Sequence, residues 1–471
     1  MTVDTDAPGA DRRNRFVYVT AALAALNGLL FGFDTGIISG AFLYIRDAFT
    51  MTPLVEGIVV SGALAGAALG AALGGYLADR WGRRRLILVS AVVFFVGSLV
   101  MAIAPTVEVL VVGRLIDGVA IGFASIVGPL YLSEIAPPKI RGSLVSLNQL
   151  AVTVGILSSY FVNYAFADGG QWRWMLGTGM VPAVILAAGM VFMPESPRWL
   201  VEHDRESKAR DVLSRTRTDD QIRAELAEIN ETIEAEDGGL LDLLEPWMRP
   251  ALVVGVGLAV LQQVTGINTV IYYAPTILES TGFESSASIL ATVGIGVVNV
   301  VMTVVAVVLI DRRGRRPLLS VGLAGMTLTL VALGAAFYLP GFSGFVGTVA
   351  TGSLMLYVAF FAVGLGPVFW LLISEIYPLK VRGTAMGVVT VFNWVANLAV
   401  SLAFPVMVAE ITTAGTFWVF AALSAVALAF TYRFVPETKG RSLEAIESDL
   451  RENMLGGSPD GSSAGTVSDD D

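Results

Sequence analysis

Three ionisable residues lie inside long apolar stretches, where a charge is costly. Asp34 stands within residues 32–36, and Arg114 and Asp117 stand one turn apart in a later stretch. An acid at membrane depth costs about 2.5–3.5 kcal/mol on insertion scales, so it is a functional candidate by default. Burial favours the neutral carboxyl and a nearby cation favours the charged one, so an acid between these effects can exchange a proton. We expect Arg114 to pair with Asp34 and this pair to couple a proton to transport; a purely structural ion pair is the alternative. Asp117 can share Arg114, but we assign it no coupling role.

Side-chain amides form a second group of polar residues within apolar stretches. A carboxamide both donates and accepts hydrogen bonds, as each hydroxyl of a neutral polyol does. A few placed polar groups in an apolar pocket are typical of a small-molecule site. Hydrogen bonding between helices is the alternative for a lone amide. The candidates are Gln149, Gln262, Gln263, Asn268, Asn299 and Asn393, with Asn397 able to serve either role.

Two further features accompany these amides. For Gln262, Gln263 and Asn268 to face one cavity, the helix must break or bend at Gly266. Four aromatic residues lie near the amides, and an aromatic face can stack on the apolar C–H face of a pyranose, although most membrane aromatics only pack or anchor. These residues are Phe31, Tyr272, Tyr273 and Trp370.

The elements that must hold these residues are membrane helices. The 471 residues are 55% hydrophobic and only 15% charged, against about 25% charged in an ordinary soluble domain. Long apolar stretches recur from Phe16 to Phe434, most of them longer than the ~20 residues that span the hydrocarbon core. We expect an all-α integral membrane protein with twelve spans at 16–45, 54–78, 86–104, 106–132, 144–166, 173–193, 250–280, 287–310, 317–338, 346–376, 384–408 and 414–434.

The remaining segments are polar. The expected organisation is a tail at 1–15, a six-helix bundle at 16–193, a helical linker at 194–249, a second bundle at 250–434 and a tail at 435–471 with a disordered end from 456. In the linker, Thr218 to Gln221 reads as a capping box, and Ile222 and Leu226 open an apolar face at helical spacing. The Gly62, Gly66, Gly70 and Gly74 series predicts close approach of another helix to the second span.

The loops predict the orientation. Most loop arginines and lysines fall in every second loop, and the loops between them hold only Arg46 and Arg173. The basic loops contain Arg80, Arg83, Arg84 and Arg85; Lys139 and Arg141; Arg312, Arg313, Arg315 and Arg316; and Lys380 and Arg382. Basic loops stay in the cytoplasm. Both termini and the linker are therefore expected on the cytoplasmic side of the cell membrane.

Three motifs occur twice in the same order. Residues 79–84 (DRWGRR) return at 311–316 (DRRGRR), residues 134–142 (EIAPPKIRG) at 375–383 (EIYPLKVRG), and residues 194–195 (PE) at 436–437. The offset is about 240 residues and spans six helices, an even number, so the halves share an orientation as parallel repeats. The acids and bases of the repeats could form ion pairs between the halves in one state and lose them in the other. Basic loops that only set topology are the alternative for the arginines. The gate candidates are Asp79, Arg80, Arg84, Glu134, Arg141, Asp311, Arg312, Arg316, Glu375 and Arg382.

These motifs, with 194–200 (PESPRWL), 262–268 (QQVTGIN) and 436–440 (PETKG), resemble the sugar porter family of the major facilitator superfamily over about residues 16 to 447. The resemblance implies alternating access of two six-helix bundles around a central sugar site, with Trp370 as a sugar contact and Tyr272 and Tyr273 at a gate. It also implies that an acid at position 34 is typical of proton-coupled members. Many such proteins carry a second glutamine where this chain has Ile156, which leaves the sugar, hexose or pentose, open.

Function is thus expected to be proton-coupled monosaccharide uptake by a monomer in the lipid bilayer. A passive facilitator, a sodium-coupled carrier and a transport-inactive sugar sensor are the alternatives. There is no Gly-rich nucleotide loop or nucleophile–base pair, and we expect neither an enzyme nor a cofactor or metal. The net charge of −10 argues against nucleic-acid binding. Only four of the 30 basic residues are lysine, which favours a halophilic source over a GC-rich genome with an acidic tail.

Overall fold

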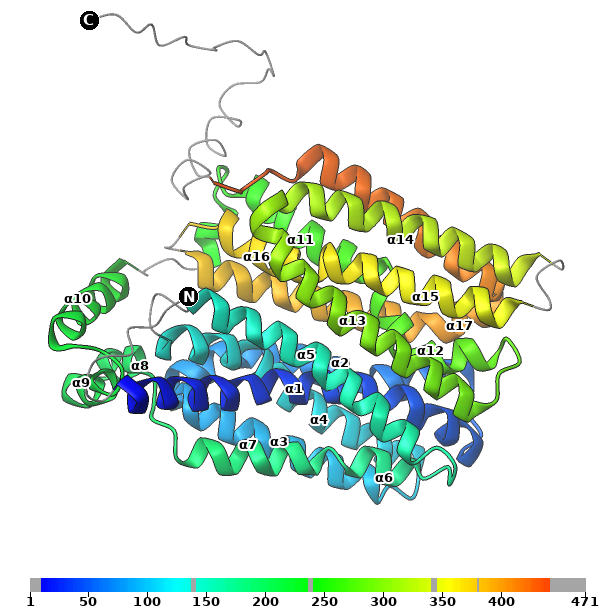
Figure 1. Cartoon of the computed structure of the whole chain (residues 1–471), viewed down its shortest axis with the longest axis horizontal. Coiled ribbons are helices and arrows are strands. Elements are labelled where there is room, and N and C mark those ends of the chain that lie inside the picture. Colours follow the sequence, from blue (N-terminus) through cyan, green and yellow to red (C-terminus); the bar gives the residue numbers. More distant parts are fainter. Residues whose placement is uncertain (1–9, 137–140, 236–239, 340–344, 379–380, 441–471) are drawn as a thin grey trace, which may run out of the picture.

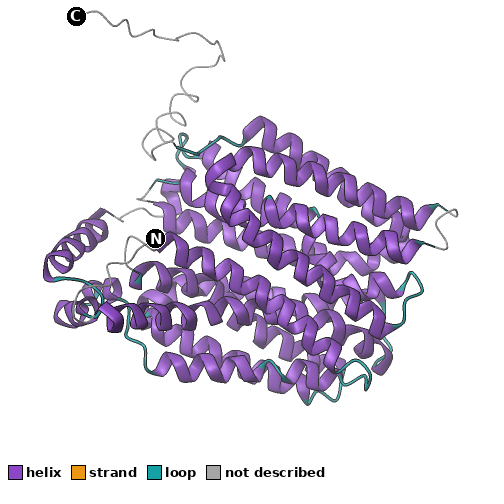
Figure 2. Cartoon of the chain, in the orientation of Figure 1, coloured by secondary structure: helices purple, strands orange, loops and turns teal. Residues whose placement is uncertain are grey.

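The computed structural model describes residues 10–136, 141–235, 240–339, 345–378 and 381–440. Throughout these residues the chain forms helices and connecting loops, without a strand (Figure 2). The predicted disordered end from residue 456, and the loop lysines Lys139 and Lys380, lie outside the described residues. The first helix begins at Ala10, earlier than the predicted start at residue 16.

The first half builds six crossings. The helices are α1 (Ala10–Ala48), α2 (Pro53–Trp81), α3 (Arg83–Ala102), α4 (Val107–Ile135), α5 (Arg141–Ala165) and the pair α6 (Trp172–Gly177) and α7 (Met180–Val191). Thr52 caps α2 by accepting a hydrogen bond from the backbone N–H of Val55, and Pro53 occupies the first turn, where a missing N–H costs nothing.

The second half repeats this arrangement. Its helices are α11 (Arg249–Val264), α12 (Ile267–Glu279), α13 (Ser285–Arg313), α14 (Arg315–Tyr338), α15 (Val346–Val363), α16 (Leu365–Ile376) and α17 (Arg382–Phe434). The long helix α17 turns at Thr412, where the backbone leaves helical geometry (φ 71°, ψ 161°), so it crosses twice. Between the halves lie α8 (Pro197–Glu202), α9 (Glu206–Ser214), α10 (Asp219–Ala235) and the 3₁₀ turn η2 (Leu240–Leu244).

These helices account for the predicted fold. Ten stretches of the described chain are long and apolar enough to cross a membrane. Adding α5, a helix of 25 residues, and counting both arms of α17 makes the twelve crossings of the predicted architecture. Figure 1 shows the two halves lying against each other, with α8 to α10 beyond one end. Helix α2 packs against α17, α5 against α13 and α1 against α12, so these three helix pairs supply most of the interface between the halves.

The glycine series of α2 allows the close approach of another helix, α4, as predicted. A Cβ added at Gly66 would lie 2.2 Å from the carbonyl oxygen of Leu115, and one at Gly70 would lie 2.3 Å from that of Val119. These distances mean that α2 and α4 touch backbone to backbone. The same approach places Gly62 beside the Cβ of Arg114, so the glycines help to position that side chain.

The linker helices form a small core of their own. Trp199, Leu213, Ile222 and Leu226 are buried together. The side chain of Gln221 accepts a hydrogen bond from the backbone N–H of Thr218 at 3.0 Å, as the predicted capping box requires.

Candidate functional site

The buried ion pair lies between α1 and α4. The Nη1 of Arg114 donates to the Oδ1 of Asp34, and its Nη2 donates to the backbone carbonyl of Val60 on α2 at 3.3 Å. Asp34 is 3% exposed and Arg114 1% exposed, so both charges are removed from solvent. The structure thus brings together the two residues that the sequence pairs. A fully buried pair of this kind is stable only while both partners remain charged and in contact.

Asp117 belongs to the same cluster. It is 1% exposed, and its carboxyl group lies within hydrogen-bonding reach of the Asp34 carboxyl. Within the described chain, neither oxygen of Asp117 accepts a bond from any N–H or O–H group, and the Nε of Arg114 is also unpartnered. One guanidinium therefore pairs with only one of two neighbouring buried acids in the first half.

A network of amides lies in the second half. The predicted helix break is confirmed: α11 ends at Val264, Gly266 adopts a left-handed conformation (φ 89°) and α12 begins at Ile267. Gly266 can adopt this conformation because it lacks a Cβ. The break turns the side chains on either side of it toward α17.

The amides of this network bond to one another. The Nε2 of Gln263 donates to Gln262 at 3.2 Å and to Asn393 at 3.1 Å, and its Oε1 accepts from Asn268 at 2.8 Å. Asn393 also donates to Gln262 at 2.8 Å. Each amide has donors and acceptors that a hydroxyl-rich ligand could exchange for its own. Four of the predicted binding residues therefore lie in one cluster.

The other predicted contacts do not bond directly to this cluster within the described chain. Tyr272 is buried and hydrogen bonds with Asn397, and Asn299 is buried on α13. Trp370 is partly buried and packs edge-on against Phe369, with the ring centroids 4.8 Å apart. Gln149 is partly buried on α5.

One aromatic contact was missed by sequence reasoning. Phe31 of the first half meets Trp394 of the second half with the ring centroids 5.5 Å apart. Trp394 is 5% exposed and directly follows Asn393. Its position next to a predicted binding residue was the signal that could have identified it as a contact.

The halves contact each other at the end of the molecule opposite the arginine-rich loops. Arg46 at the end of α1 pairs with Glu279 at the end of α12, at 2.8 Å. Tyr273 packs against Phe42 of the first half at 5.7 Å and donates to the carbonyl oxygen of Ser401 at 3.4 Å. Tyr160 of α5 donates to the carbonyl oxygen of Ile271 at 3.2 Å. This end, which we call the closed end, is therefore shut between the halves.

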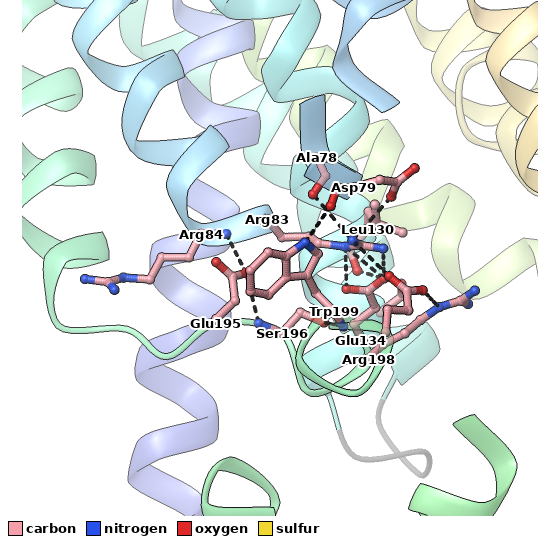
Figure 3. A network of polar contacts seen from close by, with 12 residues as sticks. Ala78, Asp79, Arg83, Arg84, Leu130, Glu134, Glu195, Ser196, Arg198 and Trp199 are labelled. Atoms are coloured by element: carbon pink, nitrogen blue, oxygen red, sulfur yellow. Dashed lines mark hydrogen bonds and ion pairs between the residues drawn. The ribbon is translucent and has the colours of Figure 1, made fainter. Parts of the chain in front are cut away.

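At the other end, here called the basic end, the ion pairs differ from the prediction. Arg83 binds Glu134 with its Nε 3.0 Å from Oε2, and Arg315 binds Glu375 with its Nη2 2.6 Å from Oε1 (Figure 3 shows the first pair). Both pairs join helices of the same half, so among the described side chains these acids pair within a half and not between the halves. The short α2–α3 turn at Gly82 (φ 97°) places Arg83 beside the end of α4.

The other predicted gate arginines bind neighbours in their own half. Arg84 donates to the carbonyl oxygens of Met190 and Val191 at the end of α7. Arg316 donates to the carbonyl oxygen of Tyr432. Four more of the predicted gate residues have local contacts. Arg80 donates to Tyr76, Arg382 donates to the carbonyl oxygen of Tyr377, Asp79 pairs with Arg83, and the carbonyl oxygen of Arg312 accepts from Lys439. The side chains of Arg141 and Asp311 lie outside the described part of the structure.

Two glutamates at this end, to which the sequence analysis assigned no role, accept hydrogen bonds from backbone N–H groups at the starts of helices. Glu195 accepts from the backbone N–H of Arg84 at 2.9 Å, and Glu437 accepts from those of Arg315 and Arg316 at 3.0 and 3.1 Å. Each carboxylate thus caps the first turn of a helix, α3 or α14, where negative charge is favourable. The repeated Pro-Glu dipeptide was the signal that could have identified them.

The capping contacts predict a pH dependence of stability. Burial opposes the charge of Glu437, but backbone N–H groups of Arg315, Lys439 and Arg316 outweigh it and lower its pKa. A carboxyl whose pKa is lower in the folded state stabilises the fold above its unfolded pKa, and this stabilisation is lost as the pH falls through the folded pKa. We expect Glu437→Gln to lower the unfolding temperature at neutral pH, and the difference from wild type to shrink below about pH 4. Tryptophan fluorescence during heating measures both, and a difference that stays constant with pH would contradict the capping role.

The linker is attached to the first half by a buried arginine. Arg217 binds both oxygens of Glu225, at 2.7 and 2.8 Å, and donates to the carbonyl oxygens of Ile135 and Ala136, both at 3.1 Å. Trp199 donates to the carbonyl oxygen of Asp79 at 2.7 Å (Figure 3). Both contacts lie at the basic end, so the linker is anchored to α2 and to the end of α4.

Comparisons with known proteins agree with this architecture. The family described as "Sugar (and other) transporter" matches residues 20–450. The galactose-proton symporter of Escherichia coli is 42% identical over 94% of this chain and 97% of its own length, and the glucose transporter GlcP of Staphylococcus epidermidis is 43% identical over 92% and 97%. The partially occluded, inward-open structure of the E. coli xylose transporter XylE superposes with a TM-score of 0.81 at 33% identity, covering 91% of this chain and 100% of that one. The chain therefore belongs to the sugar transporter family of the major facilitator superfamily.

Proposed function

We propose that this protein takes up a monosaccharide, a hexose or a pentose, together with a proton, by alternating access of its two halves. The observation that carries the proposal is the buried acid of α1 held by Arg114, in a chain whose second half carries a cluster of uncharged amides. The acid supplies the proton site and the amides supply hydrogen bonds for sugar hydroxyls. The relatives named as proton symporters of galactose and arabinose support both parts.

The charge arrangement favours a proton over sodium. A hard cation is held by several oxygen ligands, but the Oδ1 of Asp34 already accepts a hydrogen bond from the guanidinium of Arg114. In the described residues no group of three or more acids or histidines could hold a metal ion. Protonation of Asp34 would instead neutralise its carboxylate and weaken its bond to Arg114, which is a two-state change that a proton alone can drive.

Alternating access gives the two ends different roles. In the present state the closed end is shut by the Arg46–Glu279 pair and by Tyr273 packed on Phe42. Opening that end requires these contacts to break while contacts form at the basic end. The partly exposed Arg46–Glu279 pair is worth about 1 kcal/mol, so it biases the two states without locking either.

Uptake by the purified protein in liposomes tests the proposed function. A panel of hexoses and pentoses is offered with and without an imposed pH gradient, acid outside. We expect one or more sugars to accumulate above the outside concentration only when the gradient is present. Equilibration without accumulation would identify a passive facilitator, accumulation driven by a sodium gradient alone would identify a sodium-coupled carrier, and binding without uptake would identify a sensor.

The orientation is a second part of the proposal. We place the basic end, both termini and the linker on the cytoplasmic side of the cell membrane, because the arginine-rich loops lie there. The chain has no cysteine, so one introduced thiol reports one position. We expect Glu284→Cys, in the α12–α13 loop at the closed end, to react with a membrane-impermeant maleimide in intact cells, and Glu206→Cys, in the linker, to react only after permeabilisation. The reverse pattern would invert the assignment.

We further propose that the protein works as a monomer. Each transport path would lie within one chain, so a monomer suffices. The halophilic source that the acidic composition favours gains no support from the relatives and stays a prediction.

A further inference from the structure

Asp117 is the buried acid that the proposed cycle does not use. It stands on α4 one turn after Arg114, and α3 covers it closely: a Cβ added at Gly97 would lie 2.7 Å from the backbone nitrogen of Asp117 and 2.9 Å from its Cβ. No lipid or bulky side chain can enter on that side. The carboxyl group is therefore confined to the space that it shares with Asp34.

The hydrogen bonds of the cluster leave one proton unassigned. Asp34 accepts from Arg114, while both oxygens of Asp117 lack a donor in the described chain and yet lie within hydrogen-bonding reach of the Asp34 carboxyl. Two carboxylates cannot approach each other this closely with both charged, because like charges in a dry site repel strongly. A single proton between them removes one charge and supplies the missing hydrogen bond.

Among the residues that the structure describes, no other charged group lies beside the second acid to neutralise it. From α1 comes Asp34, and from α4 itself comes Arg114, which already compensates one negative charge. The side chain of Tyr272 on α12 also lies near the cluster, and an ordinary phenol carries no charge at neutral pH. Among the described groups facing the cluster, α2 contributes the Val60 carbonyl and α3 the backbone at Gly97.

We propose that Asp117 is a second proton-binding residue of the carrier, which holds a proton in the present state and shares it with Asp34. In this state Asp117 is the neutral acid, its O–H donates to the Asp34 carboxylate, and Asp34 remains paired with Arg114. When the proton moves to Asp34, Asp117 becomes the carboxylate and can accept Arg114, so the guanidinium always faces one negative charge. The O–H bond of Asp117 breaks, an O–H bond forms on Asp34, and no other covalent bond changes. The inference rests on the proposed proton symport and adds a residue to its proton site.

Infrared spectroscopy of the purified full-length protein in liposomes tests the protonation directly, without transport. A neutral carboxyl in an apolar site has a carbonyl stretch that is separate from those of carboxylates. We expect wild type at neutral pH to show this band and Asp117→Asn to lose it. The exposed acid replaced in Asp220→Asn is the matched control and should leave the band unchanged. A band retained in Asp117→Asn, or absent from wild type, would overturn the proposal.

The pH profile of uptake separates a proton-binding role from a structural one. Asp117→Asn removes one negative charge from the cluster, so the pH dependence of proton-driven uptake should shift to lower pH by about one unit. The rate of sugar exchange at equal pH needs no net proton movement and should stay within about twofold of the wild-type rate. This rate shows whether the variant is folded. Reduced exchange with an unshifted pH profile would show that Asp117 is only structural. If wild type itself accumulates no sugar, the symport proposal fails, while the infrared result still decides whether Asp117 is protonated.

Discussion

Asp34→Asn is expected to abolish accumulation of sugar against a gradient while leaving sugar exchange in place. Asparagine still offers an oxygen to Arg114 in the same position, so the helices α1 and α4 remain joined. It cannot take up a proton, and so the pH gradient is no longer coupled to the sugar. One proton moving down one pH unit supplies about 1.4 kcal/mol, which allows about tenfold accumulation. We therefore expect the ratio of inside to outside sugar to fall from about ten toward one.

Uptake into liposomes under an imposed pH gradient measures this ratio, and exchange of labelled for unlabelled sugar measures the remaining activity. Asp168→Asn, at an exposed loop acid, is the matched control and should accumulate sugar like wild type. Concentrative uptake by Asp34→Asn would disprove the coupling role of Asp34. Loss of both accumulation and exchange would point instead to a structural ion pair, the alternative that the sequence left open.

Gln263→Ala should produce the second large effect, a loss of sugar affinity. This side chain is the centre of the amide cluster, with bonds to Gln262, Asn268 and Asn393. Removing it deletes hydrogen bonds to the ligand and leaves the partner amides unsatisfied, at a cost of about 1–3 kcal/mol. The expected result is a dissociation constant raised by about ten- to hundredfold, measured by calorimetry with the sugar that the uptake panel identifies.

The control is an amide that only joins helices. Asn163 is buried on α5 and donates to the carbonyl oxygen of Gly36 on α1 at 3.2 Å. Asn163→Ala should lower the unfolding temperature and leave sugar affinity within about twofold. If Gln263→Ala also lowers stability without changing affinity, the amide cluster serves helix packing and the binding site lies elsewhere.

Much of the fold could be predicted because its signals are local. Apolar length identifies membrane crossings, and the spans were correct to within a few residues for most helices. Gly266 marked the break between α11 and α12, since its left-handed backbone follows from the missing Cβ. Where a helix is followed directly by another, as at Thr412, apolar length also separated the two crossings correctly.

The candidate site could be predicted only in part. Residue types identified Asp34, Arg114 and the amides, because polar groups are conspicuous in apolar sequence. Which arginine of a basic motif pairs with which acid depends on the direction in which each side chain leaves its helix. The motif around Gly82 offered several arginines, and only the structure shows that Arg83, rather than Arg80 or Arg84, binds Glu134.

The sequence by itself determined that this chain crosses the membrane repeatedly, that its halves are parallel repeats, and that an acid and a base are buried in the first half. Those properties follow from composition and spacing along the chain. The tertiary structure decided the partners: Arg46 meets Glu279 across the halves although 233 residues separate them, and Asp117 meets Asp34. Such contacts depend on how the helices cross and rotate against one another, which is set by close packing of the whole bundle and not by any local pattern.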